Sequence, residues 1–174
     1  MNLRIIPYLI LGLFACIFFP DFKTARAGGN KSPPTNLIIL GLDISDCTVQ
    51  EIYSKLGPTI PIRDDVYRLC YVSDRDETLL LFSIESSICT GLKVMSQKKR
   101  FYKWHFCEKS PLVSERTATE NGIKLGMTKS RLKTILGPPQ EETGQNLIYV
   151  YPGNVKITAE FSDNGMIMFD VSKY

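Results

Sequence analysis

Along this chain of 174 residues, apolar residues recur first at the spacing of a helix and then at the spacing of a strand. This order occurs twice. In segments 49–56 and 129–136, apolar side chains recur at spacings of three and four residues, which predicts two short amphipathic helices. After each helix the period changes to two, as in segment 155–161, where apolar residues alternate with polar ones. Such alternation is typical of strands with one buried face. The pattern therefore predicts two short helices, each followed by strands.

The ends of both predicted helices carry residues that start and stop helices. Thr48 and Thr128 suit the N-cap position, and Glu51 completes a capping box at the first helix. Each helix ends at Leu-Gly-Pro, where glycine adopts a left-handed cap and proline cannot continue the helix. The matching pairs lie at one offset of 80 residues, and Tyr71 falls on Tyr151 at the same offset. We interpret ten residues as this structural motif: Thr48, Leu56, Gly57, Pro58, Gly126, Met127, Thr128, Leu136, Gly137 and Pro138.

Strands account for most of the remaining chain. After the first helix we expect strands at 66–72, 78–84, 88–95 and 101–106, and after the second at 146–151, 155–161 and 166–174. The fold class we expect is α+β: a tandem repeat of a short helical layer packed on an antiparallel β-meander. The first repeat would span 37–110 and carry the disulfides, and the second would span 111–174.

The N-terminal segment resembles an export signal. Arg4 precedes an uncharged apolar run from Ile5 to Phe19, and Ala25-Arg26-Ala27 offers a cleavage site for a signal peptide at 1–27. Residues 28–36 are rich in Gly, Pro and Ser and would form a flexible lead. An alternative is lipidation of Cys16, which would make the protein an outer-membrane lipoprotein. In either case we expect an exported protein, periplasmic or secreted.

Charge gives no support for nucleic-acid binding. The whole chain has 21 basic and 18 acidic residues, and removing Arg4, Lys23, Arg26 and Asp21 with the signal leaves 18 and 17. A chain so close to neutral lacks the broad positive field that nucleic acid requires. Any basic patch must be local.

Four cysteines remain after removal of Cys16, namely Cys47, Cys70, Cys89 and Cys107. An even count in an exported chain predicts two disulfides. A turn centred near Lys98 would place Cys89 opposite Cys107, so we expect the pair Cys89–Cys107 and, by remainder, Cys47–Cys70.

Aromatic and basic residues interleave in one segment, "QKKRFYKWHF", at 97–106. On a strand, Tyr102, Trp104 and Phe106 would share a face, and burial of that face in the core is one hypothesis. The other is an exposed patch for a partner, because aromatic residues and arginine dominate interface hot spots. Such a patch suits an acidic protein, an anionic lipid headgroup at a membrane surface, or a glycan. The candidate partner-binding residues are Lys99, Arg100, Phe101, Tyr102, Lys103 and Trp104.

Catalytic signals are weak in this sequence. The single histidine, His105, has no serine elbow motif to act with, and a zinc site at His105 and Cys107 lacks a second ligand pair. The acidic run Asp74 to Glu77 lacks the spacing of a calcium loop and predicts a solvated turn. We therefore expect no catalytic residue, no metal ion and no cofactor.

The segment "GIKLGMTKSRLKTILGPPQ" at 122–140 resembles the signature of the BamE (SmpA/OmlA) family of envelope proteins, and also the tandem elements of the secreted β-lactamase inhibitor protein. The matching positions are Ile123, Gly126, Met127, Thr128, Leu132, Leu136, Gly137 and Pro139. The first copy departs from this signature, with Asp46-Cys47-Thr48 where the second has Gly126-Met127-Thr128. The resemblance implies a helical layer on an antiparallel sheet and a protein that works by binding other proteins.

Together these observations predict an exported, non-enzymatic protein-binding module, either an accessory of envelope assembly or an inhibitor-like binder. The alternative is a small exported hydrolase or ligand-binding protein that uses a groove between the two repeats. Loss of activity on replacing His105 would favour that alternative.

Overall fold

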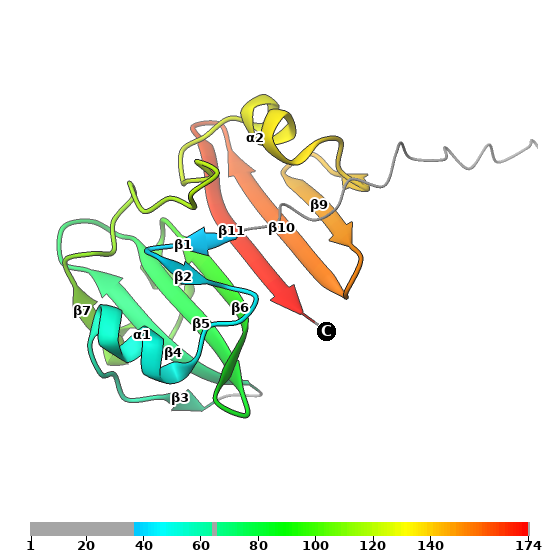
Figure 1. The fold of residues 1–174 in the computed structure, drawn as a ribbon. Helices are drawn as coiled ribbons and strands as arrows, with labels where there is room; N and C mark the ends of the chain where they lie inside the picture. The colour runs from blue at the N-terminus through cyan, green and yellow to red at the C-terminus, as the bar shows by residue number, and fades with distance from the viewer. Residues whose placement is uncertain (1–36, 64–65, 174) are drawn as a thin grey trace, which may run out of the picture.

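The computed structural model describes residues 37–63 and 66–173 (Figure 1). The predicted signal peptide at 1–27, the lead at 28–36 and Cys16 lie outside the described residues. The α-helices are α1 (Val49–Leu56) and α2 (Lys129–Leu136), and the 3₁₀ turns are η1 (Lys98–Arg100) and η2 (Trp104–Phe106). The strands are β1 (Ile38–Ile39), β2 (Leu42–Asp43), β3 (Ile62–Arg63), β4 (Tyr67–Ser73), β5 (Leu79–Glu85), β6 (Ile88–Met95), β7 (Glu108–Ser110), β8 (Glu141–Glu142), β9 (Asn146–Tyr151), β10 (Val155–Ser162) and β11 (Gly165–Lys173).

One large sheet joins both halves of the chain. Its strands lie in the order β3-β4-β5-β6-β11-β10-β9-β8, and β7 pairs in parallel with β4. The junction between the halves is the antiparallel pair β6–β11, in which Leu92 lies opposite Val171 and Lys93 opposite Asp170. The last strand of the chain therefore completes the sheet at its centre, as Figure 1 shows.

The predicted fold class, a tandem helical layer on antiparallel meanders, is wrong. The described chain is mostly β, with eleven strands and only two eight-residue α-helices. Each helix buries just two side chains, Ile52 and Leu56 in α1 and Leu132 and Leu136 in α2. Helices this small cover only part of a sheet. The sequence patterns located the helices correctly but gave no measure of how little of the sheet they cover.

The main apolar core lies on one face of the sheet. Strand residues on alternate positions, such as Phe82, Val94 and Ile157, pack there with the buried residues of both helices. The β1–β2 hairpin and the segment from Val113 to Met127 add further side chains to the same core. In Figure 1, α1 lies over the β3–β6 part of the sheet and α2 beside the β9–β11 part. The two helices, the β1–β2 hairpin and the segment from Val113 to Met127 therefore each cover a part of this face.

The predicted start of α1 is confirmed in detail. The Thr48 hydroxyl accepts a hydrogen bond from the Glu51 backbone N–H, and the Glu51 carboxylate accepts one from the Thr48 N–H at 2.7 Å. The bonds that the Thr48 N–H and the Thr48 hydroxyl donate to the Glu51 carboxylate hold the pKa of this carboxyl below its usual value. Thr128 caps α2 by accepting from the Arg131 N–H, without the reciprocal bond because Arg131 replaces the acid.

The helix stops also form as expected, with one difference in backbone geometry. Gly57 and Gly137 have φ of 88° and 87°, and each N–H donates to the carbonyl four residues earlier. Their ψ values are extended, however, so the glycines leave the helix directly into extended chain instead of adopting the left-handed helical cap. Tyr71 then donates to the Gly57 carbonyl, and Tyr151 donates to the Leu136 carbonyl. Two tyrosines at the same offset thus satisfy carbonyl groups at the two helix ends.

The Gly-Met-Thr motif lies against the β10–β11 turn. The Gly126 N–H donates to the Met166 carbonyl, and the Met166 N–H donates to the Met127 carbonyl. A Cβ atom at Gly165 would collide with the Gly126 backbone, and Gly126 itself has φ of 77°. Both glycines are therefore required by close backbone approach and positive φ, and the motif has a structural role here.

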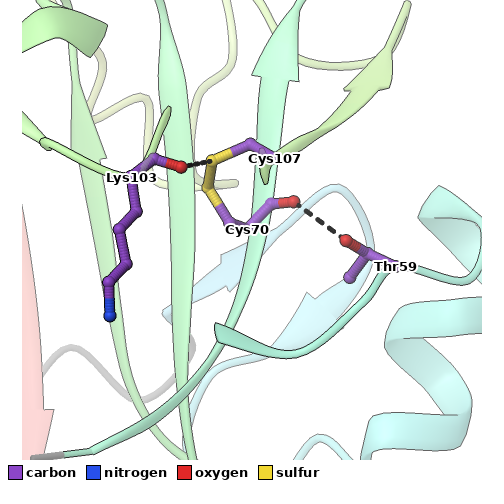
Figure 2. Close-up of a disulfide and its surroundings, with 4 residues drawn as sticks. All are labelled: Thr59, Cys70, Lys103 and Cys107. Carbon is purple, nitrogen blue, oxygen red and sulfur yellow. Dashed lines mark hydrogen bonds between the residues drawn. A yellow bond between two sulfur atoms is a disulfide. The ribbon is translucent and has the colours of Figure 1, made fainter. Parts of the chain in front are cut away.

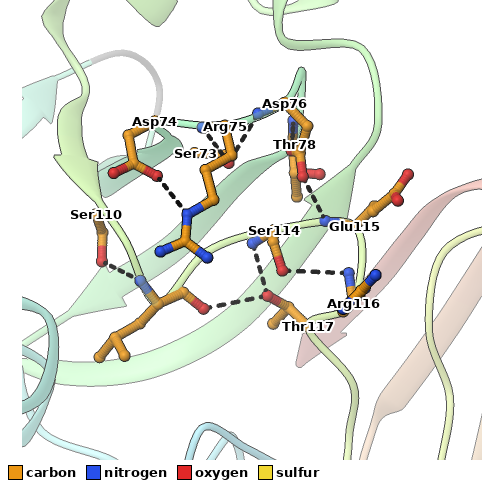
Figure 3. A network of polar contacts seen from close by, with 11 residues as sticks. Ser73, Asp74, Arg75, Asp76, Thr78, Ser110, Ser114, Glu115, Arg116 and Thr117 are labelled. Atoms are coloured by element: carbon orange, nitrogen blue, oxygen red, sulfur yellow. Dashed lines mark hydrogen bonds and ion pairs between the residues drawn. The ribbon is translucent and has the colours of Figure 1, made fainter.

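Polar contacts fasten the connection between the two halves to the β4–β5 turn (Figure 3). The Asp76 carboxylate accepts hydrogen bonds from the backbone N–H groups of Thr78 and Glu115, at 2.8 and 3.0 Å. Partial burial alone would raise the pKa of Asp76, but these bonds and those from the Thr78 and Ser73 side chains outweigh it, so the pKa lies below its usual value. The acidic run Asp74 to Glu77 therefore lies in a turn, as predicted, and Asp76 of this turn also binds the backbone of Glu115.

Candidate functional site

The aromatic and basic segment forms a loop at residues 98–106, which we call the aromatic–basic loop. It contains the 3₁₀ turns η1 and η2, so the strand predicted at 101–106 is wrong. The Lys98 N–H donates to the Glu77 carbonyl at 2.9 Å, and the nearby Ser96 N–H donates to the Ile167 carbonyl. The chain therefore leaves β6 and crosses the second face of the sheet instead of turning back to pair with β6.

Two aromatic side chains of the loop attach it to the sheet. Phe101 is buried in a second apolar cluster, on the face opposite the main core, together with Val72, Leu81 and Met95. Trp104 is half-buried against the same cluster, and the Lys98 ammonium lies 5.0 Å from its ring. The loop therefore covers this part of the second face as the helices cover part of the first.

The other two aromatic residues of the loop are exposed. Tyr102 and Phe106 are 70% and 71% exposed, the largest values for aromatic residues of the described chain. The hypothesis that Tyr102, Trp104 and Phe106 form one buried strand face is therefore wrong. Because 3₁₀ turns repeat every three residues, Phe101 and Trp104 come to share a face, and the side chains between and after them turn outward.

The cationic residues of the loop differ in how they are engaged. Arg100 forms an ion pair with Glu160 of β10 at 2.9 Å, which connects the loop to the other half of the chain. Lys98 pairs with Glu77 at 3.3 Å, and the Lys103 ammonium donates to the Arg63 carbonyl. Lys99 is exposed and has no ion-pair partner among the described residues. Of the six predicted residues, Tyr102 and Lys99 are thus exposed at the surface, while Phe101, Trp104 and Arg100 hold the loop in position.

A disulfide closes the loop at its C-terminal end (Figure 2). Cys107 is bonded to Cys70 of β4, with their Cα atoms 4.7 Å apart. Thr59 donates to the Cys70 carbonyl, so the segment after α1 meets the same point. The predicted pairs Cys89–Cys107 and Cys47–Cys70 are therefore wrong. They followed from the predicted strand at 101–106, whereas the loop carries Cys107 across the sheet to β4.

The remaining cysteines, Cys47 and Cys89, are buried in the main core as thiols. Cys47 precedes the N-cap of α1, and Cys89 lies at the start of β6. The hydrogen bond between their side chains and their burial raise the pKa of the Cys47 thiol. The Cys89 thiol also donates to the Gly91 carbonyl at 3.2 Å.

Beyond the loop, the second face of the sheet carries charged and polar side chains among apolar ones. Lys93 of β6 and Asp170 of β11 form an ion pair across the junction at 2.7 Å. The strand register places Thr158 beside Asp170, with Ile148 on the next strand. These side chains are half-buried, as on a sheet face that no helix covers. Loop and open face are continuous through the Arg100–Glu160 pair, and together they form the candidate interaction surface.

A shallow groove lies at the turn of the β10–β11 hairpin. Its volume is about 570 Å³, and its lining includes Ser96, Arg116, Lys124, Gly126 and Met127. No cysteine or histidine lines it. If the protein were a hydrolase or a ligand-binding protein, this groove would be the candidate site for its substrate or ligand.

The described part of the chain offers few side chains for catalysis or for metal binding. His105 is exposed, and its ring contacts that of Trp104 with centroids 3.7 Å apart and planes tilted by 33°. Within residues 37–63 and 66–173, no three His, Cys, Asp or Glu side chains are placed to hold a metal ion. No helix in these residues is long and apolar enough to cross a membrane.

Sequence reasoning missed two contributors to the surface. Phe106 is absent from the predicted partner-binding residues, and Glu160 lies 60 residues from the arginine that it pairs with. No local pattern in the sequence could have indicated that contact.

Comparisons with models of protein families, with curated proteins and with solved structures find no match to this chain.

Proposed function

We propose that this chain is an exported, non-enzymatic module that binds another protein through the aromatic–basic loop and the adjacent open face of the sheet. The observation that carries the proposal is the exposure of Tyr102 and Phe106, at 70% and 71%, on a loop that is otherwise firmly attached. Large exposed aromatic side chains are the residues that most often dominate protein interfaces.

The attachment of the loop matters because ordering a flexible segment reduces binding affinity. Phe101 is buried, Cys107 is covalently bonded to β4, and Arg100 is paired with Glu160. Binding then orders side chains and not the backbone of the loop, at about 0.5–1.5 kcal/mol for each side chain that becomes immobilised. A preorganised loop of this kind supports a binding role better than a flexible one would.

Local charge favours a protein partner with an acidic surface. Lys99 is exposed, and Lys103 lies beside Tyr102 with its ammonium 5.1 Å from the ring. The resemblance of segment 122–140 to BamE-type proteins and to the β-lactamase inhibitor protein supports two roles for such a binder, envelope assembly or inhibition of an enzyme.

Site-specific photocrosslinking tests this proposal in the full chain. A benzophenone amino acid placed at Tyr102 or at Phe106 should crosslink one and the same protein in the producing cells. The matched control is Ile60, an apolar residue outside the loop that is 81% exposed. Crosslinking to the same protein from Ile60, or none from both loop positions, would contradict the proposal.

Once the partner is purified, Tyr102→Ser and Phe106→Ser should each raise Kd about 10- to 30-fold, as expected for hot-spot residues. Ile60→Ser should leave Kd within about 2-fold, as expected outside a hot spot. Turnover of a substrate that survives both loop substitutions and is lost on Lys124→Ala, in the groove, would favour the alternative function.

A further inference from the structure

Cys47 and Cys89 lie directly opposite each other in a short antiparallel pairing. Thr48 forms a β-bridge with Ile88, and the Val49 N–H donates to the Ser87 carbonyl at 3.1 Å. The Cys89 N–H donates to the Cys47 carbonyl at 2.8 Å. Because residue numbers run in opposite directions along antiparallel strands, the neighbour of Thr48 faces the neighbour of Ile88. The backbone itself therefore aligns the two cysteines.

This alignment meets the geometric requirement for a disulfide. The pair keeps one of the two bonds of a hydrogen-bonded antiparallel pair, because the Cys47 N–H donates to the Asp43 carbonyl. In such pairs the Cα atoms lie about 5.5 Å apart, within the span of roughly 4.4–6.8 Å that disulfides bridge. Opposite side chains also point to the same face of the sheet. Both cysteines are buried in the main core.

We propose that Cys47 and Cys89 are the site of a second disulfide, which joins the start of α1 to β6. The bond requires an oxidant, and the chemical class that fits an exported chain is an external disulfide. The Cys47 thiol loses its proton and attacks the oxidant, which forms a mixed disulfide and releases one thiolate. The Cys89 thiolate then attacks Cys47 Sγ and displaces the second thiolate. Two protons and two electrons leave the protein, and the oxidant becomes two thiols.

Access to Cys47 is limited but present. An open groove of about 230 Å³ is lined by Cys47 together with Asp43, Glu51 and Lys55. Since Cys47 is almost fully buried and its pKa is raised, exchange in the folded protein should be slow. The same burial would protect the bond from reductants once it has formed. The two disulfides would then hold opposite faces of one sheet. This inference shares the expectation of export with the proposed function, but it does not rest on the aromatic–basic loop or on a partner.

Peptide mapping of the unreduced full chain tests the pairing directly. Trypsin places each cysteine on its own peptide: 32–55 for Cys47, 69–75 for Cys70, 76–93 for Cys89 and 104–109 for Cys107. After free thiols are blocked, we expect 32–55 linked to 76–93 and 69–75 linked to 104–109. The protein is first equilibrated with oxidised glutathione for long enough that the Cys70–Cys107 link is complete. Blocked, unlinked Cys47 and Cys89 under that condition, or either one linked elsewhere, would overturn the proposal.

Thermal unfolding under oxidising conditions gives a second test. Cys47→Ala, Cys89→Ala and the double variant should all lower Tm by the same amount, about 6–16 °C, since each removes one bond. If the double variant loses the sum of the two single losses, the cysteines contribute separately and no bond joins them. Should the variants not fold, the peptide map of the unaltered chain still decides the question.

Discussion

Single residues show how local environment decides the role of chemically similar side chains. Tyr149 and Tyr151 lie on the same face of β9 with nearly parallel rings, 6.4 Å apart. Tyr151 donates its hydroxyl to the Leu136 carbonyl, whereas the buried Tyr149 hydroxyl has no hydrogen-bond partner among the described residues. Burial raises the pKa of Tyr149 to about 12. A buried hydroxyl without a partner reduces stability relative to an apolar side chain of the same shape.

Tyr149→Phe is therefore expected to stabilise the protein, by about 1 kcal/mol in the free energy of unfolding, because it removes an unsatisfied group. Tyr151→Phe is the matched control and should destabilise by about 0.5–1.5 kcal/mol, since it removes a hydrogen bond and leaves a carbonyl without its partner. Urea denaturation followed by circular dichroism measures both. Equal changes of the same sign in the two variants would contradict this account.

At the scale of elements, turns and caps carry connections that hydrophobic patterns do not reveal. The β4–β5 turn holds the chain between the halves through Asp76, whose carboxylate accepts from Thr78 and Glu115 (Figure 3). Its pKa is lower in the folded protein than in the unfolded chain. The stabilisation is therefore fully present above the unfolded value, about 4. It is lost as pH falls through the lower folded value.

Asp76→Asn should lower the free energy of unfolding by about 1–2 kcal/mol at neutral pH, because an amide cannot accept at both positions. The difference from the unaltered protein should shrink as pH falls through the folded pKa of Asp76. Asp74→Asn serves as control, since Asp74 is exposed and only pairs with Arg75 at 3.6 Å, and it should change stability by less than about 0.5 kcal/mol. A pH-independent loss in Asp76→Asn would show that the charge is not responsible.

The whole molecule depends on the β6–β11 pairing at the centre of the sheet. The five residue pairs of this ladder run from Gly91–Ser172 to Met95–Met168, so β11 joins the strands of the first half to those of the second. Separation of the halves would expose two long strand edges and the apolar side chains beside them. Exposed edges of this kind favour aggregation over folding.

We expect the fragments 37–110 and 111–174 to lack a cooperative thermal transition when each is expressed alone. Mixed together under refolding conditions, they should recover part of the circular dichroism signal of the intact chain, because they restore the missing ladder. A cooperative transition in either isolated fragment would show that the central ladder is dispensable.

Much of the local structure follows from the sequence because it depends on neighbouring residues. The Thr48 and Thr128 caps, the Gly57 and Gly137 stops and most strand segments arise from backbone geometry within a few residues. Such preferences act before any tertiary contact forms. The sequence also singled out the 97–106 segment as unusual in composition, although it assigned the wrong conformation.

Only the tertiary structure decided which residues meet across long separations. The joining of two meanders into one sheet, the Cys70–Cys107 bond and the Arg100–Glu160 pair each link segments that no local pattern relates. Alternation on a strand would have buried Tyr102 and Phe106, but crossing of the sheet face by the loop exposes them. Local preferences determine elements, whereas burial of shared apolar surface determines how elements pair and therefore which side chains remain at the surface.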